Sequence, residues 1–242
     1  MNKFFDKILN FFFPKGLKCI FCGNDIPNFN ESPYCEECAK DNIFNDAPKR
    51  CKICDTPIYS ESDYCDGCRK NSKAFDKAVA PFVYEGKVRS MVLRFKNDNA
   101  KYLANPMAKL MADKLIKENI EFDVIVPVPL SEKSFKKRKY NQSLLLAEQL
   151  SLILNKPLNS EVLTKIKETK HQKELTYDQR QRNLTGAFQI NNSSEIKNKK
   201  ILLVDDILTT CATANHLSML LKKHAASVNV IAFARTVYLN KR

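Results

Sequence analysis

Eight of the nine cysteines in this chain lie between positions 19 and 68, where they form four Cys-x-x-Cys pairs separated by 12, 12 and 10 residues. A Cys-x-x-Cys pair supplies two thiolates to one metal ion from a tight turn, and a second pair nearby completes a tetrahedral four-thiolate site. The spacing therefore predicts two metal centres, and zinc is the ordinary occupant of such sites. The predicted ligands are Cys19, Cys22, Cys35, Cys38, Cys51, Cys54, Cys65 and Cys68.

The eight ligands can be divided between the two centres sequentially, four and then four, or as an interleaved cross-brace. Both halves follow one plan, with a Cys-x-x-Cys pair, a polar loop and a tyrosine (Tyr34 or Tyr64) before the second pair. This internal repeat favours the sequential division, a tandem zinc ribbon over residues 19–70. All-thiolate ligation leaves no open position for water, so we expect a structural role for the metal.

The cysteines could instead form the disulfides of a secreted protein, and such a protein would need an export signal in its N-terminal segment. Its apolar run is broken by Asp6, Lys7 and Asn10, no small-residue cleavage site follows, and the run is too short to span a bilayer. Apolar residues at helical spacing instead predict an amphipathic helix over residues 1–18, which packs on the protein or contacts a membrane or a partner. We expect a cytoplasmic protein without stable membrane insertion.

Charge is distributed unevenly along the chain. Residues 1–70 hold 10 basic and 11 acidic side chains, whereas residues 71–242 hold 30 and 16, a net charge of +14 in a chain of net charge +13. Such a surplus favours a polyanionic partner, either nucleic acid or a phosphorylated ligand. The near-zero net charge of residues 1–70 makes the ribbons within them poor candidates for nucleic-acid contact.

From residue 71 onward, apolar strands alternate with amphipathic helices, which is typical of an α/β fold with a parallel sheet. A long polar stretch between residues 167 and 183 is expected to be a functional or mobile loop, and residues 131–139 are expected to form a basic loop. Strands are expected within 76–86, 122–130, 162–167, 186–190, 199–206 and 228–236, and helices within 87–96, 106–118, 141–154 and 212–224.

The segment KKILLVDDILTTCATA is the sharpest local motif. A hydrophobic strand is expected to end in Asp205 and Asp206, and a turn containing Thr209, Thr210 and Thr213 opens a helix. A helix N-terminus and hydroxyl groups suit a phosphate, and carboxylates at a strand end can hold ribose hydroxyls. The alternative is that the two carboxylates only cap the helix.

Five segments in one order resemble the ComF family, also called ComFC or competence protein F. They are the tandem Cys-x-x-Cys pairs, DVIVPVPL, KKRKYNQ, HQKEL with RQRNLTGAF, and VDDILTT. In addition, LLVDDILTTCATA resembles the phosphoribosyl pyrophosphate (PRPP) signature of type I phosphoribosyltransferases. The resemblance spans nearly the whole chain and implies a type I phosphoribosyltransferase-like parallel-sheet domain over residues 71–242, preceded by the double zinc ribbon.

The resemblance also implies a PRPP site. Asp205 and Asp206 would be the catalytic pair and contact the ribose hydroxyls, the following loop would wrap the 5′-phosphate, and Mg²⁺ would enter with the pyrophosphate near Val128. The implied PRPP-binding residues are Val128, Asp205, Asp206, Thr209, Thr210, Cys211, Ala212 and Thr213.

Two basic elements align with the family pattern, and they could clamp pyrophosphate, bind a nucleic-acid backbone or hold the domain together. Their candidate residues are Lys136, Lys137, Arg138, Lys139, Asn141, Gln142, Arg180 and Arg182. Two positions depart from the pattern, because Cys211 and Lys139 stand where the family usually has glycine, the residue that tolerates a positive φ.

The family resemblance and the charge together favour a competence protein that handles incoming single-stranded DNA in natural transformation and contacts other competence proteins, such as a ComF-type helicase. Phe135, Tyr140 and Tyr177 are aromatic residues near basic ones that could stack on bases. The alternative is an active Mg-dependent phosphoribosyltransferase with an unidentified acceptor, and a third reading is a zinc-stabilised scaffold with an inactive pocket.

Overall fold

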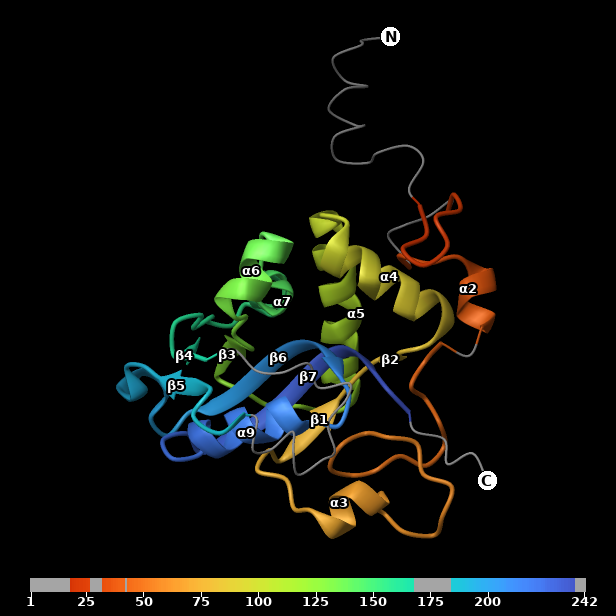
Figure 1. The fold of residues 1–242 in the computed structure, drawn as a ribbon. Coiled ribbons are helices and arrows are strands. Elements are labelled where there is room, and N and C mark those ends of the chain that lie inside the picture. Colours follow the sequence, from red (N-terminus) through yellow and green to blue (C-terminus); the bar gives the residue numbers. More distant parts are fainter. Residues whose placement is uncertain (1–17, 27–31, 42, 168–183, 238–242) are drawn as a thin grey trace.

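The computed structural model describes residues 18–26, 32–41, 43–167 and 184–237 (Figure 1). The amphipathic helix expected over residues 1–18 therefore lies outside the described residues, apart from Lys18. None of the described helices combines the length and the apolar composition that a membrane-spanning segment needs.

The centre of the described chain is a five-stranded parallel sheet made of β1 (Lys77–Val79), β2 (Phe82–Val83), β3 (Val124–Pro127), β6 (Lys200–Leu208) and β7 (Ser227–Arg235). The strand order is β1-β7-β6-β3, and β2 pairs with β7 beyond the end of β1. Most side chains of β6 and β7 are buried, as expected for parallel strands that are covered on both faces.

Helices cover the two faces of the sheet unequally, as Figure 1 shows. One face packs against α4 (Gly86–Asn97), α5 (Ala104–Lys117) and α7 (Gln142–Leu154), and the other against α9 (Ala212–Leu221). The smaller elements are α2 (Glu36–Lys40), α3 (Asp66–Lys70), η1 (Lys101–Leu103), α6 (Glu132–Arg138), η3 (Ser193–Ile196) and an antiparallel pair, β4 (Leu163–Lys165) with β5 (Phe188–Ile190).

The two groups of cysteines lie on opposite faces of the sheet. Cys19 and Cys38 are buried in one core together with side chains of α4 and α5. Cys51, Cys54 and Cys68 are buried in the other core together with side chains of α9. Each ribbon therefore extends a hydrophobic core of the sheet domain.

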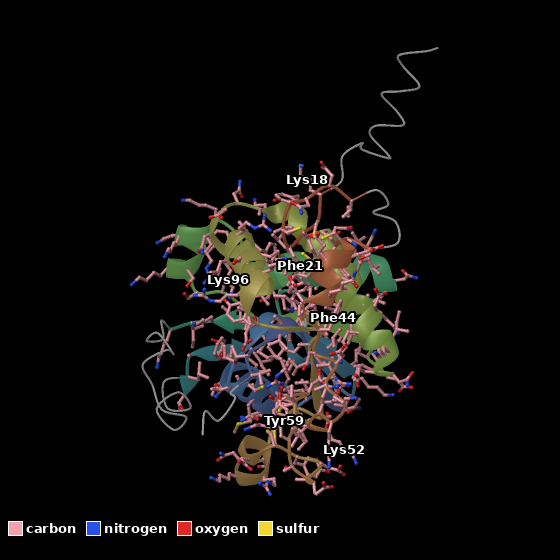
Figure 2. The ribbon with its side chains drawn as sticks, turned by 90° about the vertical axis from the view of Figure 1, so that its right-hand side faces the viewer. Lys18, Phe21, Phe44, Lys52, Tyr59 and Lys96 are labelled. Atoms are coloured by element: carbon pink, nitrogen blue, oxygen red, sulfur yellow. The ribbon has the colours of Figure 1, made fainter. Side chains whose placement is uncertain are left out.

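Aromatic rings join the first ribbon to the sheet. The centroid of the Phe21 ring lies 5.3 Å from that of Phe82 in β2, and the Phe82 ring lies 4.8 Å from Phe233 in β7. Figure 2 shows Phe21 above the sheet and Tyr59 of the second ribbon below it.

A buried ionic network joins the second ribbon to α5. Arg50 contacts the carboxylate of Asp55 and lies 2.7 Å from a carboxylate oxygen of Glu118 at the end of α5. Lys77 and Lys114 also reach Glu118, at 2.7 and 3.0 Å. Burial alone would raise the pKa of Glu118, but hydrogen bonds from Lys77, Arg50 and Lys114 hold this pKa well below its usual range.

The basic segment 131–139, expected to be a loop, instead forms the helix α6. Ser131 provides the N-cap, because its Oγ accepts a hydrogen bond from the backbone N–H of Ser134 at 3.4 Å. Lys139 ends the helix in the left-handed region with φ of 67°, and its N–H donates to the carbonyl of Phe135 at 2.7 Å. This is a conformation that glycine adopts without steric cost.

We expect Lys139→Gly to stabilise the fold. Removing the strain of the left-handed conformation should raise the free energy of unfolding by roughly 1–2 kcal/mol. The greater freedom of glycine in the unfolded chain should lower it by about 0.5–1 kcal/mol, so we expect a net increase of about 0.5–1 kcal/mol. Urea unfolding measures this difference. The matched variant Lys137→Gly, inside the same helix, should lose about 1 kcal/mol, and a loss of stability for Lys139→Gly would contradict the prediction.

Candidate functional site

The candidate site is the crevice where β3 and β6 part. After β3 the chain continues to α7 on the face covered by α5, whereas after β6 it enters α9 on the opposite face. Ligands of open parallel sheets bind outside the carboxyl ends of the strands at such a switch point. Pairing of β3 with β6 ends at Val204, immediately before the two predicted carboxylates.

β6 does not end at those carboxylates, which corrects the expectation from the sequence. The strand continues to Leu208, because β7 still pairs with it at Ile207 and Leu208. On the other side the pairing with β3 has already ended, so Asp205 and Asp206 lie in a part of β6 that is paired only with β7.

The two carboxylates are held by protein groups. The Oγ of Ser143 in α7 donates to Asp205 Oδ1 at 3.1 Å, and the backbone N–H of Asp206 donates to the same oxygen at 2.8 Å. Lys96 of α4, labelled in Figure 2, places its Nζ 2.9 Å from Asp206 Oδ2. Burial and the adjacent charge of Asp206 raise the pKa of Asp205 to about 7.

Lys96 and Ser143 were absent from the residues predicted for the site. Ser143 is the residue after Gln142, with which the KKRKYNQ segment ends, so the predicted element stops one residue short of it. Lys96 belongs to an ordinary amphipathic helix, and nothing in its neighbourhood marks it as a partner of a residue 110 positions later.

The threonine-rich loop lies between β6 and α9, as predicted. Thr209 and Thr210 form the turn, and α9 begins at Ala212, so Thr213 lies in its first turn. The Oγ1 of Thr210 is buried and has no hydrogen-bond partner among the described residues. An unpaired hydroxyl beside the free N–H groups of a helix N-terminus fits an anionic ligand such as a phosphate.

Cys211 is the N-cap of α9 and has φ of 60°. The backbone therefore takes the left-handed conformation that suits glycine, although a side chain is present. The Cys211 side chain is buried, and burial raises the pKa of its thiol. The thiol is protonated at neutral pH as a result.

The second ribbon packs against the loop between β6 and α9 and against α9 itself. Cys211 belongs to the same buried cluster as Cys54. Arg235, at the end of β7, donates a hydrogen bond to the carbonyl of Cys54. The Oδ1 of Asn215 in α9 accepts from the N–H of Ala74, just after the ribbon, at 2.7 Å.

The first basic element lies at the rim of the crevice, on α6 and the residues after it. Asn141 is the N-cap of α7, and its Nδ2 donates to the carbonyl of Val128 at 3.0 Å, so it ties the predicted pyrophosphate segment to the helix. Gln142 is buried and accepts from Arg138 at 3.0 Å, and its Nε2 has no partner among the described residues. The cations of the last turn of α6 are Lys136, Lys137 and Arg138, and Lys139 is the cap.

Not all of the predicted contact residues are brought to the crevice. Arg180 and Arg182, and the aromatic Tyr177, lie outside the described residues. Tyr140 is wrong as a base-stacking residue, because only 5% of it is exposed and its hydroxyl donates to the carbonyl of Phe95. Phe135 is 51% exposed and remains available.

The cysteine sulfurs meet in two groups of four, which confirms the sequential division. All sulfurs of a group lie within 4.8 Å of one another. The Sγ atoms of Cys22 and Cys35 are 3.7 Å apart, and those of Cys54 and Cys65 are 3.6 Å apart. Four bonds of about 2.3 Å at tetrahedral angles place sulfurs about 3.8 Å apart, so both groups fit a zinc ion.

Comparison with known proteins agrees with this architecture. The phosphoribosyl transferase domain family matches residues 102–241. Competence protein F of Haemophilus influenzae is 30% identical over 222 residues, which cover 89% of this chain and 94% of that protein.

Two further relatives match about half of the chain. DNA utilization protein YhgH of Escherichia coli is 35% identical over 116 residues, 48% of this chain and 50% of its own length. Competence protein ComFC of Bacillus subtilis is 36% identical over 119 residues, 47% of this chain and 45% of its own. With one relative matched over nearly its full length and two groups of four cysteines ahead of the parallel sheet, the chain belongs to the ComF family of competence proteins and carries a phosphoribosyltransferase domain.

Proposed function

We propose that this protein handles incoming single-stranded DNA during DNA uptake and that its crevice is a PRPP-binding pocket. Two of its relatives are named competence proteins and another a DNA utilization protein. The observation that carries the proposal is that β3 and β6 are neighbouring parallel strands, so that the basic helix α6 follows one carboxyl end and the carboxylate pair and the α9 N-terminus lie at the other.

Each part of the crevice suits one part of PRPP. Asp205 and Asp206 accept hydrogen bonds from the ribose hydroxyls, and the N-terminus of α9 with the Thr210 hydroxyl binds the 5′-phosphate. The segment around Val128 faces the pyrophosphate. Mg²⁺ enters with the pyrophosphate and keeps most of its water ligands.

The protein should bind PRPP in the presence of Mg²⁺, and the double variant Asp205→Asn, Asp206→Asn should lose at least about tenfold in affinity, equivalent to about 1.4 kcal/mol. Ionised carboxylates are the better acceptors for hydroxyl groups. Because the pKa of Asp205 is raised to about 7, affinity should increase as the pH rises through 7. Isothermal titration calorimetry measures both effects.

Asp113→Asn is the matched control, because Asp113 is an exposed carboxylate of α5 outside the crevice. Its affinity for PRPP should equal that of the wild type. Absence of PRPP binding by the wild-type protein would refute the pocket.

A second candidate function is transfer of the phosphoribosyl group to an acceptor, by displacement of pyrophosphate at the anomeric carbon. The fixed positions of the carboxylates favour it, since Ser143 and Lys96 hold Asp205 and Asp206 before any ligand arrives. Release of pyrophosphate in samples that contain single-stranded DNA separates this function from binding alone.

DNA contact is assigned to α6. Its last turn presents cations to solvent, and the only carboxylate of this helix, Glu132, lies 3.9 Å from Lys136 and is 89% exposed. Phosphates of a DNA strand can therefore approach these cations and release counterions. The ribbons hold more acidic than basic side chains and are left for partner proteins, such as a ComF-type helicase.

Affinity for single-stranded DNA should fall steeply with salt. Replacing Lys136 and Lys137 by Gln should reduce the slope of log K against log [salt] by about 0.7 per lysine that contacts a phosphate. Fluorescence anisotropy with a labelled oligothymidylate measures the slope. Lys117→Gln, an exposed lysine at the far end of α5, is the control with an unchanged slope, and weak, salt-independent binding by the wild type would exclude DNA contact.

We further propose that both cysteine groups hold zinc. Elemental analysis should then find about two zinc ions per chain, one for each four-thiolate group. Cys38→Ser should lower this to about one ion and reduce thermal stability, because Cys38 is fully buried in the core. Cys211→Ser, outside both groups, should keep two, and loss of zinc from this control would contradict the assignment.

A further inference from the structure

Two large aromatic rings at the carboxyl end of the sheet are exposed to solvent. Phe135, on α6, is 51% exposed, and Tyr102, on η1, is 72% exposed. α6 follows the carboxyl end of β3, and η1 precedes α5, which runs back along the sheet. Lys96, near the end of α4 and shortly before η1, contacts Asp206, so both elements lie at the carboxyl end of the sheet.

A short chain of contacts links the two rings. The carbonyl of Phe135 accepts from the N–H of Lys139 at 2.7 Å, and Tyr140 follows Lys139. The Nζ of Lys101 lies 5.1 Å from the centroid of the Tyr140 ring, and Tyr102 is the next residue after Lys101. The buried Tyr140 thus fixes the element that carries one exposed ring against the element that carries the other.

Cations flank both rings along the chain, since Lys101 precedes Tyr102 and Lys136 follows Phe135. We define the two-ring surface as the exposed rings together with the basic side chains of the last turn of α6, of its cap and of η1. Its members are Tyr102, Phe135, Lys101, Lys136, Lys137, Arg138 and Lys139. Basic groups alternating with exposed rings are the arrangement with which proteins bind single strands, because every base has a face that can stack and every phosphate attracts a cation.

A cavity of about 500 Å³ adjoins Phe135. Its lining includes the apolar residues Pro127 and Leu163, the cations Lys136 and Lys165, and one carboxylate, Glu132. A base that stacks on Phe135 would have room there, with Lys136 and Lys165 in the lining for the neighbouring phosphates.

We propose that unpaired bases of a DNA strand stack on Phe135 and Tyr102 while the cations of the two-ring surface hold the phosphates between them. This inference rests on the proposed function and specifies the surface that DNA uses. Stacking requires bases that are free of a duplex, so the surface should prefer single-stranded over double-stranded DNA.

The chain contains no tryptophan, which makes a direct test available. Phe135→Trp and Tyr102→Trp each introduce a single fluorophore at a proposed stacking position. Addition of oligothymidylate at low salt should quench both, because a stacked base contacts the indole. Tyr59→Trp is the matched control, since Tyr59 is 80% exposed on the second ribbon and should not be quenched.

Affinity measurements complete the test. Phe135→Ala and Tyr102→Ala should each weaken binding by about 5- to 150-fold, the equivalent of one lost stacking contact, without changing the salt slope. Phe135→Tyr and Tyr102→Phe should retain binding, and Tyr59→Ala should match the wild type. If a variant has the same free energy of unfolding in urea as the wild type, its loss of affinity comes from the lost ring and not from a damaged fold.

The outcomes separate this inference from the proposed function. If the wild type binds DNA with a steep salt slope but neither tryptophan is quenched and neither alanine variant weakens binding, the stacking surface is refuted and the charge-based contact stands. If the wild type does not bind DNA at all, the proposed DNA function and the inference both fail.

Discussion

A parallel sheet must be covered on both faces, and in this protein helices alone do not cover it. α9 lies on one face and three longer helices on the other, and each core is extended by side chains of a cysteine ribbon. The ribbons thus contribute to the cores themselves. Ion pairs also hold the second ribbon to α5: Arg50 of the ribbon contacts Glu118, and Lys114 of α5 contacts Asp55 of the ribbon.

The same sheet determines where chemistry can take place. β6 pairs with β7 beyond the point at which β3 has ended, so the two aspartates lie on a strand that is open on one side. The chain after β3 reaches α7 on one face of the sheet, whereas the chain after β6 enters α9 on the opposite face, and ligands of open parallel sheets bind at such a point. Lys96 and Ser143 then reach the carboxylates from two different helices, α4 and α7.

Features encoded by local sequence could be predicted, whereas features created by tertiary contact could not. The Cys-x-x-Cys spacing predicted the two sulfur groups, and VDDILTT predicted a strand, a turn and a helix. The sequence predicts a loop in place of α6, because residues 132–138 lack apolar residues at helical spacing. The N-cap Ser131 is nevertheless recognisable in the sequence. The burial of Tyr140 and the ion pair of Lys96 depend on α4 packing beside residues far along the chain, which no local pattern records. The PRPP and DNA roles of the site residues remain predictions.

The place of β7 in the sheet has a consequence for biosynthesis. β7 is the last strand of the described chain, yet it pairs with β1, β2 and β6 and so joins both halves of the sheet. While the ribosome is still making this segment, β1 and β2 have no partner strand, and the apolar residues around them have no finished core. The ribbons can load metal as soon as their cysteines emerge, but the sheet can close only after β7, well over a hundred residues later, has been translated.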